Sequence, residues 1–271
     1  MKIGVSFTPG GLLLPYHVGV LDALDHCGVV TPETPIAGSS AGAIAVAAHA
    51  AGVPSQTVLE ATIDISDRCQ AMGGARGRLL PLLREKLQEL ITDEPFQRLQ
   101  ERPGLSGVAY REVLPQFRDI LQYEYHNPAD LIQAVCNSSM FPFFSSNWPV
   151  TVDRTGRRFP RLVMDGFFTV PRSRFGAPDF AMANEVVDRT IIVSPFPQDK
   201  MRLDAVSRED CISPGVGADV GRLFQIATEV TSRKELTSVY EEGWRDAEEW
   251  YRAERSRQQS DSKPDELVLL N

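Results

Sequence analysis

The stretch that decides the fold is PIAGSSAGAIAVAAHAAG, residues 35–52. A short apolar segment enters five small residues at 38–42, and an alanine-rich run follows and ends at Gly52. This order predicts a buried strand, a tight turn and a helix. The residues before it have the same order, with a β-prone run over 3–7, a glycine turn, and apolar residues at helical spacing up to Gly28. Such alternation predicts a parallel sheet with crossover helices and a ligand site at the carboxyl ends of its strands.

The rest of the chain completes one α/β domain. We expect residues 55–130 to be mostly helical, with breaks at Gly73-Gly74, Pro95 and Pro103-Gly104, and we expect two further buried strands at 162–164 and 190–193. Helical periodicity returns over 220–230 and 236–251. Without an internal repeat or a clear linker, the prediction is one domain over 1–253 and a polar, flexible tail over 254–271.

One amphipathic segment, residues 79–91, has a basic flank formed by Arg76, Arg78, Arg84 and Lys86. A helix that lies on a lipid surface would have this pattern, but most such helices pack on a core, and packing is the favoured interpretation.

Composition excludes several classes of protein. The chain has 271 residues, and 28 Lys+Arg against 36 Asp+Glu give a net charge of −8, which argues against nucleic-acid binding. Four cysteines without CxxC spacing suggest neither zinc nor disulfides, so we expect reduced thiols and a cytoplasmic protein. The longest apolar run, 43–51, is about half the roughly 20 residues that a membrane span needs, and no secretory signal is evident.

Gly38-Ser39-Ser40-Ala41-Gly42 fits the G-x-S-x-G pattern. A nucleophile on a strained turn between strand and helix needs small residues around it, and Ser40 would lie at a helix N-terminus, where the dipole favours developing negative charge. A triad would also need a histidine base, but His17, His26 and His49 fall within predicted helices and His126 in a polar stretch. A carboxylate can replace it. Asp165, at the end of a buried strand and before Gly166, is the candidate, and the alternative that stays open is a turn former or N-cap before Gly166.

Taken together, Ser40 with its glycines and Asp165-Gly166 resemble the Ser-Asp dyad of patatin-like phospholipases. Further blocks resemble the branch of that family containing adipose triglyceride lipase and adiponutrin: residues 6–19, ending Tyr16-His17-Val18-Gly19, and residues 137–144, 193–196, 212–214 and 240–247. The resemblance implies a three-layer α/β/α fold with a mainly parallel central sheet.

The resemblance also implies the roles of the site residues. Ser40 is the nucleophile, Asp165 the base, and the backbone amides of Gly10, Gly11 and Ala41 hold the oxyanion, with Gly38, Gly42 and Gly166 as motif glycines. The chain departs from the family in two places. Pro9 and Leu14 replace the first and last glycines of the G-x-G-x-x-G segment, and Phe167 replaces a small residue. Proline has no N–H, and the loss of one oxyanion donor costs roughly 3 kcal/mol.

The implied activity is hydrolysis of lipid acyl esters through an acyl-enzyme, with no metal or organic cofactor, on a lipid substrate at a membrane or droplet surface. The acyl channel is expected among the apolar residues Leu12, Leu13, Leu14, Met140, Phe141, Phe143 and Phe144. Two alternatives stay open: transfer of the acyl group to lysophospholipid or glycerol, and a non-catalytic lipid-binding regulator on the same fold.

Overall fold

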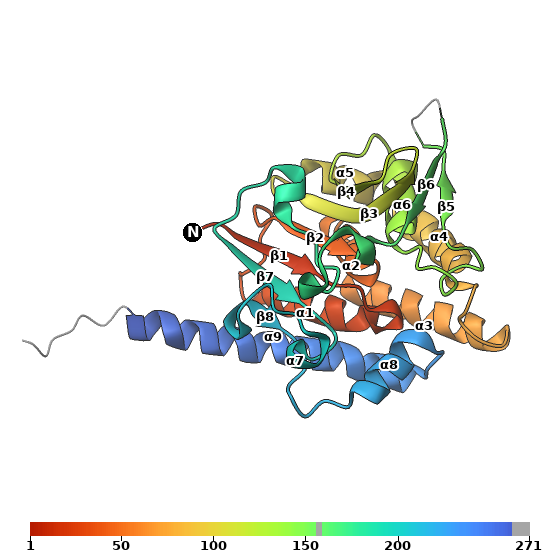
Figure 1. Cartoon of the computed structure of the whole chain (residues 1–271). Coiled ribbons are helices and arrows are strands. Elements are labelled where there is room, and N and C mark those ends of the chain that lie inside the picture. The colour runs from red at the N-terminus through yellow and green to blue at the C-terminus, as the bar shows by residue number, and fades with distance from the viewer. Residues whose placement is uncertain (156–158, 262–271) are drawn as a thin grey trace, which may run out of the picture.

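The computed structural model describes residues 1–155 and 159–261, and its centre is a mixed sheet of eight strands (Figure 1). The order is β5-β6-β3-β2-β1-β7-β8, and β4 also pairs with β3. The strands are β1 (Ile3–Phe7), β2 (Ile36–Ser39), β3 (Ser106–Leu114), β4 (Arg118–Gln122), β5 (Thr151–Asp153), β6 (Arg161–Met164), β7 (Arg189–Val193) and β8 (Cys211–Ile212).

The sheet is parallel on one side and antiparallel on the other. β1 pairs in parallel with β2 and β7, as do β2 with β3 and β7 with β8. In contrast, β3 is antiparallel to β4 and β6, and β5 is antiparallel to β6. The predicted strands at 162–164 and 190–193 are both present, but the first of them runs against its neighbour, so the sheet is less parallel than expected.

Helices flank the sheet, and together they give the expected three-layer α/β fold. They are α1 (Leu14–His26), α2 (Ala41–Ala50), α3 (Ser55–Ala71), α4 (Leu79–Leu90), α5 (Asp93–Glu101), α6 (Pro128–Ser138), α7 (Gln198–Met201), α8 (Val220–Thr228) and α9 (Arg233–Asp261). Short 3-10 helices cover Gly11–Leu13, Gly166–Thr169, Arg172–Arg174, Phe180–Ala183 and Arg208–Asp210.

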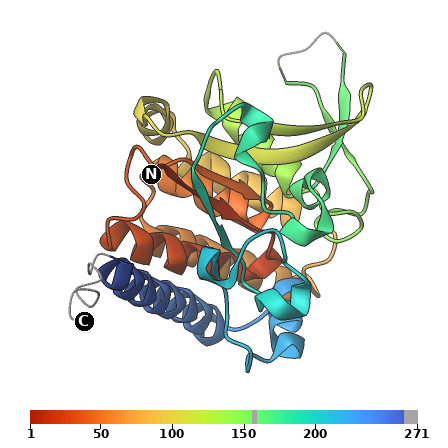
Figure 2. The same ribbon diagram turned by 60° about the vertical axis from the view of Figure 1, so that its left-hand side comes forward.

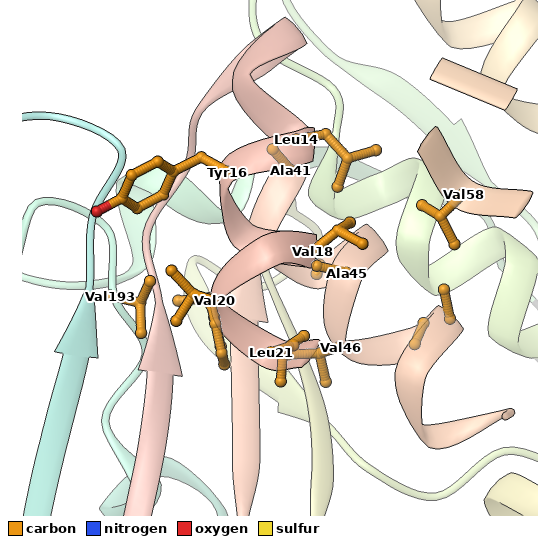
Figure 3. Packing of buried hydrophobic residues seen from close by; sticks show 14 of the residues in the cluster. Leu14, Tyr16, Val18, Val20, Leu21, Ala41, Ala45, Val46, Val58 and Val193 are labelled. Atoms are coloured by element: carbon orange, nitrogen blue, oxygen red, sulfur yellow. The ribbon is translucent and has the colours of Figure 1, made fainter. Parts of the chain in front are cut away.

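Alternating side chains separate the two faces of the sheet. Val5 and Phe7 of β1 join the large core under α1 and α2, whereas Ser6 turns to the opposite face and donates a hydrogen bond to the Pro178 carbonyl. Figure 3 shows this core, in which Val18 and Leu21 of α1 contact α2. The α1–α2 layer thereby fixes the start of α2, where the serine motif lies.

Helix α9 packs along α1 as an outer layer (Figure 2). The two helices approach closely at glycines: a Cβ on Gly19 would lie 2.1 Å from the Tyr240 carbonyl oxygen, and a Cβ on Gly243 would lie 2.2 Å from that of Tyr16. The Tyr16 hydroxyl donates to Asp246 at 2.7 Å, and that of Tyr240 to Asp22 at 2.5 Å. The two glycines at the crossing and the two tyrosine–aspartate hydrogen bonds therefore hold α9 against the outer side of α1.

Two expectations about secondary structure need correction. Residues 106–114 and 118–122 form the β3–β4 hairpin and not helices, because the continuous burial of Val108, Ala109 and Tyr110 on both faces of the sheet overrides the weak helical pattern. The expected flexible tail from Glu254 is helical as far as Asp261, as the last part of α9. Glu254 accepts two hydrogen bonds from Arg189, which tie this part of the helix to β7. Residues 262–271 lie outside the described part of the chain. No helix in the described residues is long and apolar enough to cross a membrane.

Candidate active site

Ser40 is the single residue between β2 and α2, and its backbone is strained. Its φ is +53° and its ψ is −120°, a conformation that side-chain-bearing residues rarely adopt. The Ser40 N–H donates to Oγ of buried Ser138, at the end of α6, over 2.8 Å. The turn is thus held at its amide by a residue from another element, and it presents the Ser40 side chain to a cavity.

The two motif glycines are required by close packing at this turn. A Cβ on Gly38 would lie 2.3 Å from the carbonyl carbon of Gly42, and a Cβ on Gly42 would lie 2.6 Å from Cβ of Phe7 and 2.7 Å from its carbonyl oxygen. These atoms cannot move without displacing β1 or the first turn of α2. The G-x-S-x-G spacing therefore has a steric cause in this fold.

Asp165 follows directly after β6 and is completely buried. Its Oδ1 accepts the Phe167 N–H at 2.8 Å, and its own N–H donates to the Met140 carbonyl at 2.9 Å. Its Oδ2 has no regular hydrogen-bond partner among the described residues. Burial raises the pKa of the Asp165 carboxyl to about 7, although the Phe167 amide and the nearby Ser40 side chain both favour its charged form. A carboxylate with this pKa and a free oxygen can accept a proton near neutral pH.

The register of β3 brings Ser40 and Asp165 together. Ser39, at the end of β2, pairs with Ala109, and Met164, at the end of β6, pairs with Arg111. β2 and β6 occupy the same edge of β3, because β4 takes the other edge over 108–112. The two strands run toward each other, so their carboxyl ends meet about two residues apart along β3.

Gly166 allows this meeting. A Cβ there would lie 2.3 Å from the Ala109 carbonyl oxygen and 2.7 Å from Oγ of Ser39. A residue without a side chain is needed here, because the chain after β6 passes directly against Ser39 at the end of β2 and Ala109 of β3.

The expected oxyanion residues line the same cavity as Ser40. Gly10 precedes the 3-10 turn Gly11–Leu13, and Ala41 is the first residue of α2, so these N–H groups lie where a helical turn has no internal carbonyl to bind them. A Cβ on Gly10 would be 3.6 Å from Cβ of Ala41, which places the two segments side by side. Gly11 has a φ of +56° and lies against the Ala227 carbonyl, so it too must be glycine.

The cavity has a volume of about 410 Å³ and an apolar wall. Of the residues expected to form an acyl channel, Leu12, Leu14, Phe141 and Phe144 line it. Leu13 and Met140 are instead buried in the protein, and Phe143 is exposed. The other large apolar side chains of the wall come from α2, α3, α4, α7, α8 and connecting segments; they are Ile44, Ile65, Leu79, Leu80, Leu83, Phe167, Phe175, Phe196, Met201 and Phe224.

None of the four histidines lines this cavity. His17 is fully buried against Phe7, and burial lowers its pKa to about 3. Burial also lowers the pKa of His49, which lies in the last turn of α2, at the other end of that helix from Ser40. The described residues contain no group of three or more His, Cys, Asp or Glu side chains placed to hold a metal ion.

Sequence reasoning assigned no role to Ser138 or to α8. Ser138 lies within the block 137–144 that resembles the family, but a hydrogen bond to an amide 98 residues away leaves no local signal. Phe224, Ala227 and Thr228 of α8 reach the cavity only because that helix packs against the Gly11–Leu13 turn.

The fold and this site define an α/β protein with a serine turn at the end of a central strand. The family model "Patatin-like phospholipase" matches residues 5–172, and the chain belongs to that family. Membership supports lipid acyl hydrolase activity in general. Among solved structures, VipD from Legionella pneumophila has a similar fold, with a TM-score of 0.50 and 11% identity over 92% of this chain and 67% of that one. Among curated proteins, none matches the sequence significantly.

Proposed function

We propose that this protein hydrolyses lipid acyl esters with Ser40 as nucleophile and Asp165 as general base. The observation that carries the proposal is the meeting of β2 and β6, which places a strained serine beside a buried carboxyl of raised pKa at an apolar cavity. Oδ1 of Asp165 caps the 3-10 helix Gly166–Thr169, whereas its buried Oδ2 has no regular hydrogen-bond partner among the described residues and is available to take the proton of Ser40.

The reaction follows from these positions. As Oγ of Ser40 attacks the ester carbonyl carbon, Asp165 takes its proton, and the N–H groups of Gly10, Gly11 and Ala41 stabilise the oxyanion. The intermediate collapses, the ester C–O bond breaks, and Asp165 returns the proton to the departing alcohol. Water then attacks the acyl-Ser40 ester and gives a proton to Asp165; the bond between the acyl carbon and Oγ breaks, Asp165 returns the proton to Oγ of Ser40, and the fatty acid is released.

Pro9 does not prevent this chemistry. It cannot donate a hydrogen bond, but the next two residues and the start of α2 supply three N–H groups at one end of the cavity. The acyl chain would occupy the apolar wall between α3, α4 and α8. We further propose that the substrate is drawn from a membrane or droplet surface in the cytoplasm, and that the chain is nearest the adipose triglyceride lipase and adiponutrin branch, as Tyr16-His17-Val18-Gly19 suggests.

A serine-directed fluorophosphonate tests the nucleophile. The wild-type protein should be labelled and Ser40→Ala should not, while Ser39→Ala, one residue away at the end of β2, serves as the matched control and should still be labelled. An unlabelled wild-type protein that is folded by circular dichroism would instead support a non-catalytic lipid-binding regulator. Product analysis with mixed phospholipids and acylglycerols, comparing the wild type with Ser40→Ala, then identifies the lipid class and separates hydrolysis from acyl transfer.

A further inference from the structure

Two connections meet beside the cavity. The residues between α3 and α4, and the first turn of α4, lie against the loop that follows α6: the Gly77 N–H donates to the Phe144 carbonyl at 2.6 Å, and the N–H of Leu80 in α4 donates to the Ser145 carbonyl at 2.9 Å. In Figure 1 both connections lie at the right-hand end of the molecule. The second connection reaches the cavity wall through Phe141, Phe144 and Ser145, and Leu80 of α4, just after the first connection, also lines the cavity.

This pair of connections exposes large apolar side chains to solvent. Trp148 is 71% exposed, Phe143 52% and Met72 44%. The Phe143 N–H donates to the Trp148 carbonyl at 3.3 Å, so the two aromatic residues are neighbours. Phe143 also has a φ of +57°, which means that its backbone is strained in the conformation that leaves its ring exposed. We call Met72, Arg76, Arg78, Phe143 and Trp148 the rim surface.

The charge of the rim surface is opposite to that of the whole protein. The net charge is −8, yet residues 68–84 include no acidic residue and residues 141–152 include no charged residue of either sign. Nε of Arg76 donates to the Phe143 carbonyl at 3.0 Å, which anchors an exposed guanidinium beside the aromatic residues. Arg78 donates to the Gly74 carbonyl at 2.8 Å and lies in the same connection.

The remainder of the expected basic flank does not belong to this surface. Arg84 donates to Gln133, and Lys86 pairs with Asp64 and Glu89. The apolar side of α4 is buried through Leu82, Leu83 and Leu87, so that helix packs on the core and is not itself a lipid-surface helix. Of the four basic residues of that flank, Arg76 contacts an exposed aromatic residue, and Arg78 lies two residues further along the same connection.

We propose that the rim surface docks the protein on a phospholipid bilayer and so presents the cavity to the lipid. This inference rests on the proposed function, because it names the surface through which that site would receive its substrate. Tryptophan and phenylalanine side chains favour the boundary between headgroups and acyl chains, and arginine can bind lipid phosphate there. In this arrangement the acyl chain leaves the bilayer beside Phe143 and Trp148 and enters the cavity past Phe141 and Phe144 without crossing water.

The test is binding to vesicles of phosphatidylcholine containing one-fifth phosphatidylglycerol, measured by co-sedimentation and by the fluorescence of Trp148. The wild type should sediment with the vesicles, and its emission should shift to the blue. Trp148→Gln should abolish most of the shift. Each aromatic residue should contribute about tenfold to partitioning, so Phe143→Asn combined with Trp148→Gln should bind about a hundredfold more weakly. Asparagine suits the positive φ at 143.

Val186→Gln is the matched control. Val186 is 77% exposed and precedes β7, at the amino ends of the parallel strands and away from Ser40. This variant should bind like the wild type. On a short-chain ester dissolved in water, the double rim variant should keep wild-type kcat/KM, because neither side chain lines the cavity, whereas its hydrolysis of vesicle lipid should fall with binding.

The outcomes separate docking from catalysis. Ser40→Ala should bind vesicles normally; if it binds while the wild type hydrolyses no ester, docking stands and the proposed function fails. If the wild type hydrolyses the soluble ester but does not sediment with vesicles, or if the double rim variant binds as well as the wild type, docking is refuted. Self-association through the rim surface without vesicle binding would likewise refute it and indicate a protein partner.

Discussion

Replacement of Asp165 by asparagine should abolish activity and, at the same time, stabilise the fold. The carboxyl has a pKa of about 7 in the folded protein against an ordinary value of 3.8, because burial disfavours its charged form. The folded state therefore binds this proton more tightly than the unfolded chain does. The contribution of Asp165 to stability is greatest below pH 3.8, decreases as the pH rises to about 7, and is constant above that.

The size of the effect follows from the shift of about three pKa units. At about 1.4 kcal/mol per unit, the raised pKa costs the folded protein about 4 kcal/mol at pH 8, where Asp165 is ionised, and about 2 kcal/mol at pH 5, where the folded protein keeps Asp165 protonated and the unfolded chain does not. Asparagine has nearly the same shape, its Oδ1 can still accept the Phe167 N–H, and it carries no charge. Asp165→Asn should thus raise the free energy of unfolding, and the gain should be about 2 kcal/mol larger at pH 8 than at pH 5.

Urea unfolding of the wild type and the variant at both pH values measures this gain, and hydrolysis of a soluble ester measures activity. Asp153→Asn is the matched control, because Asp153 is also buried but is paired with Arg161 and has a lowered pKa. Its replacement leaves Arg161 without that partner and should destabilise the protein. The claim that Asp165 is a buried carboxylate that destabilises the fold is refuted if Asp165→Asn unfolds at a lower urea concentration than the wild type at pH 8. It is also refuted if the gain in free energy of unfolding is the same at both pH values. Retained ester hydrolysis would remove Asp165 as the base.

Three further substitutions test the site. Ser138→Ala removes the acceptor of the Ser40 N–H and should lower stability by about 1–2 kcal/mol and kcat about tenfold with little change in KM, as urea unfolding and steady-state kinetics would show. Gly42→Ala places a Cβ 2.6 Å from Cβ of Phe7 and should destabilise by more than about 3 kcal/mol, seen as a lower Tm or as insoluble protein. His126→Ala should keep ester hydrolysis within about twofold, and a large rate loss there would reinstate a catalytic histidine.

The candidate nucleophile was predictable because its signal is local. The run from Ile36 to Gly52 contains a strand, a turn and a helix in contiguous residues, and the steric demand at Gly38 comes from Gly42 within the motif, although that at Gly42 comes from Phe7 of β1. The β3–β4 hairpin was not predictable in this way. Tyr110 and Leu121 belong to its strands because they are buried against partners elsewhere in the chain, and helix propensity over 106–122 carries no information about such partners.

The sequence by itself determined that a serine stands on a tight turn between strand and helix, that an aspartate ends a later buried strand, and that no histidine is placed to serve the serine. Only the tertiary structure decided that these two residues meet. β6 runs antiparallel to β3, and its end pairs with Arg111, close to Ala109, with which the end of β2 pairs. Ser40 and Asp165 therefore meet at one point of the sheet although 124 residues lie between them in the chain. Pairing direction and register depend on long-range hydrogen bonds and on burial of both faces of the sheet. The raised pKa of Asp165 also depends on tertiary structure, because the carboxyl loses its water only when the surrounding chain has closed over it.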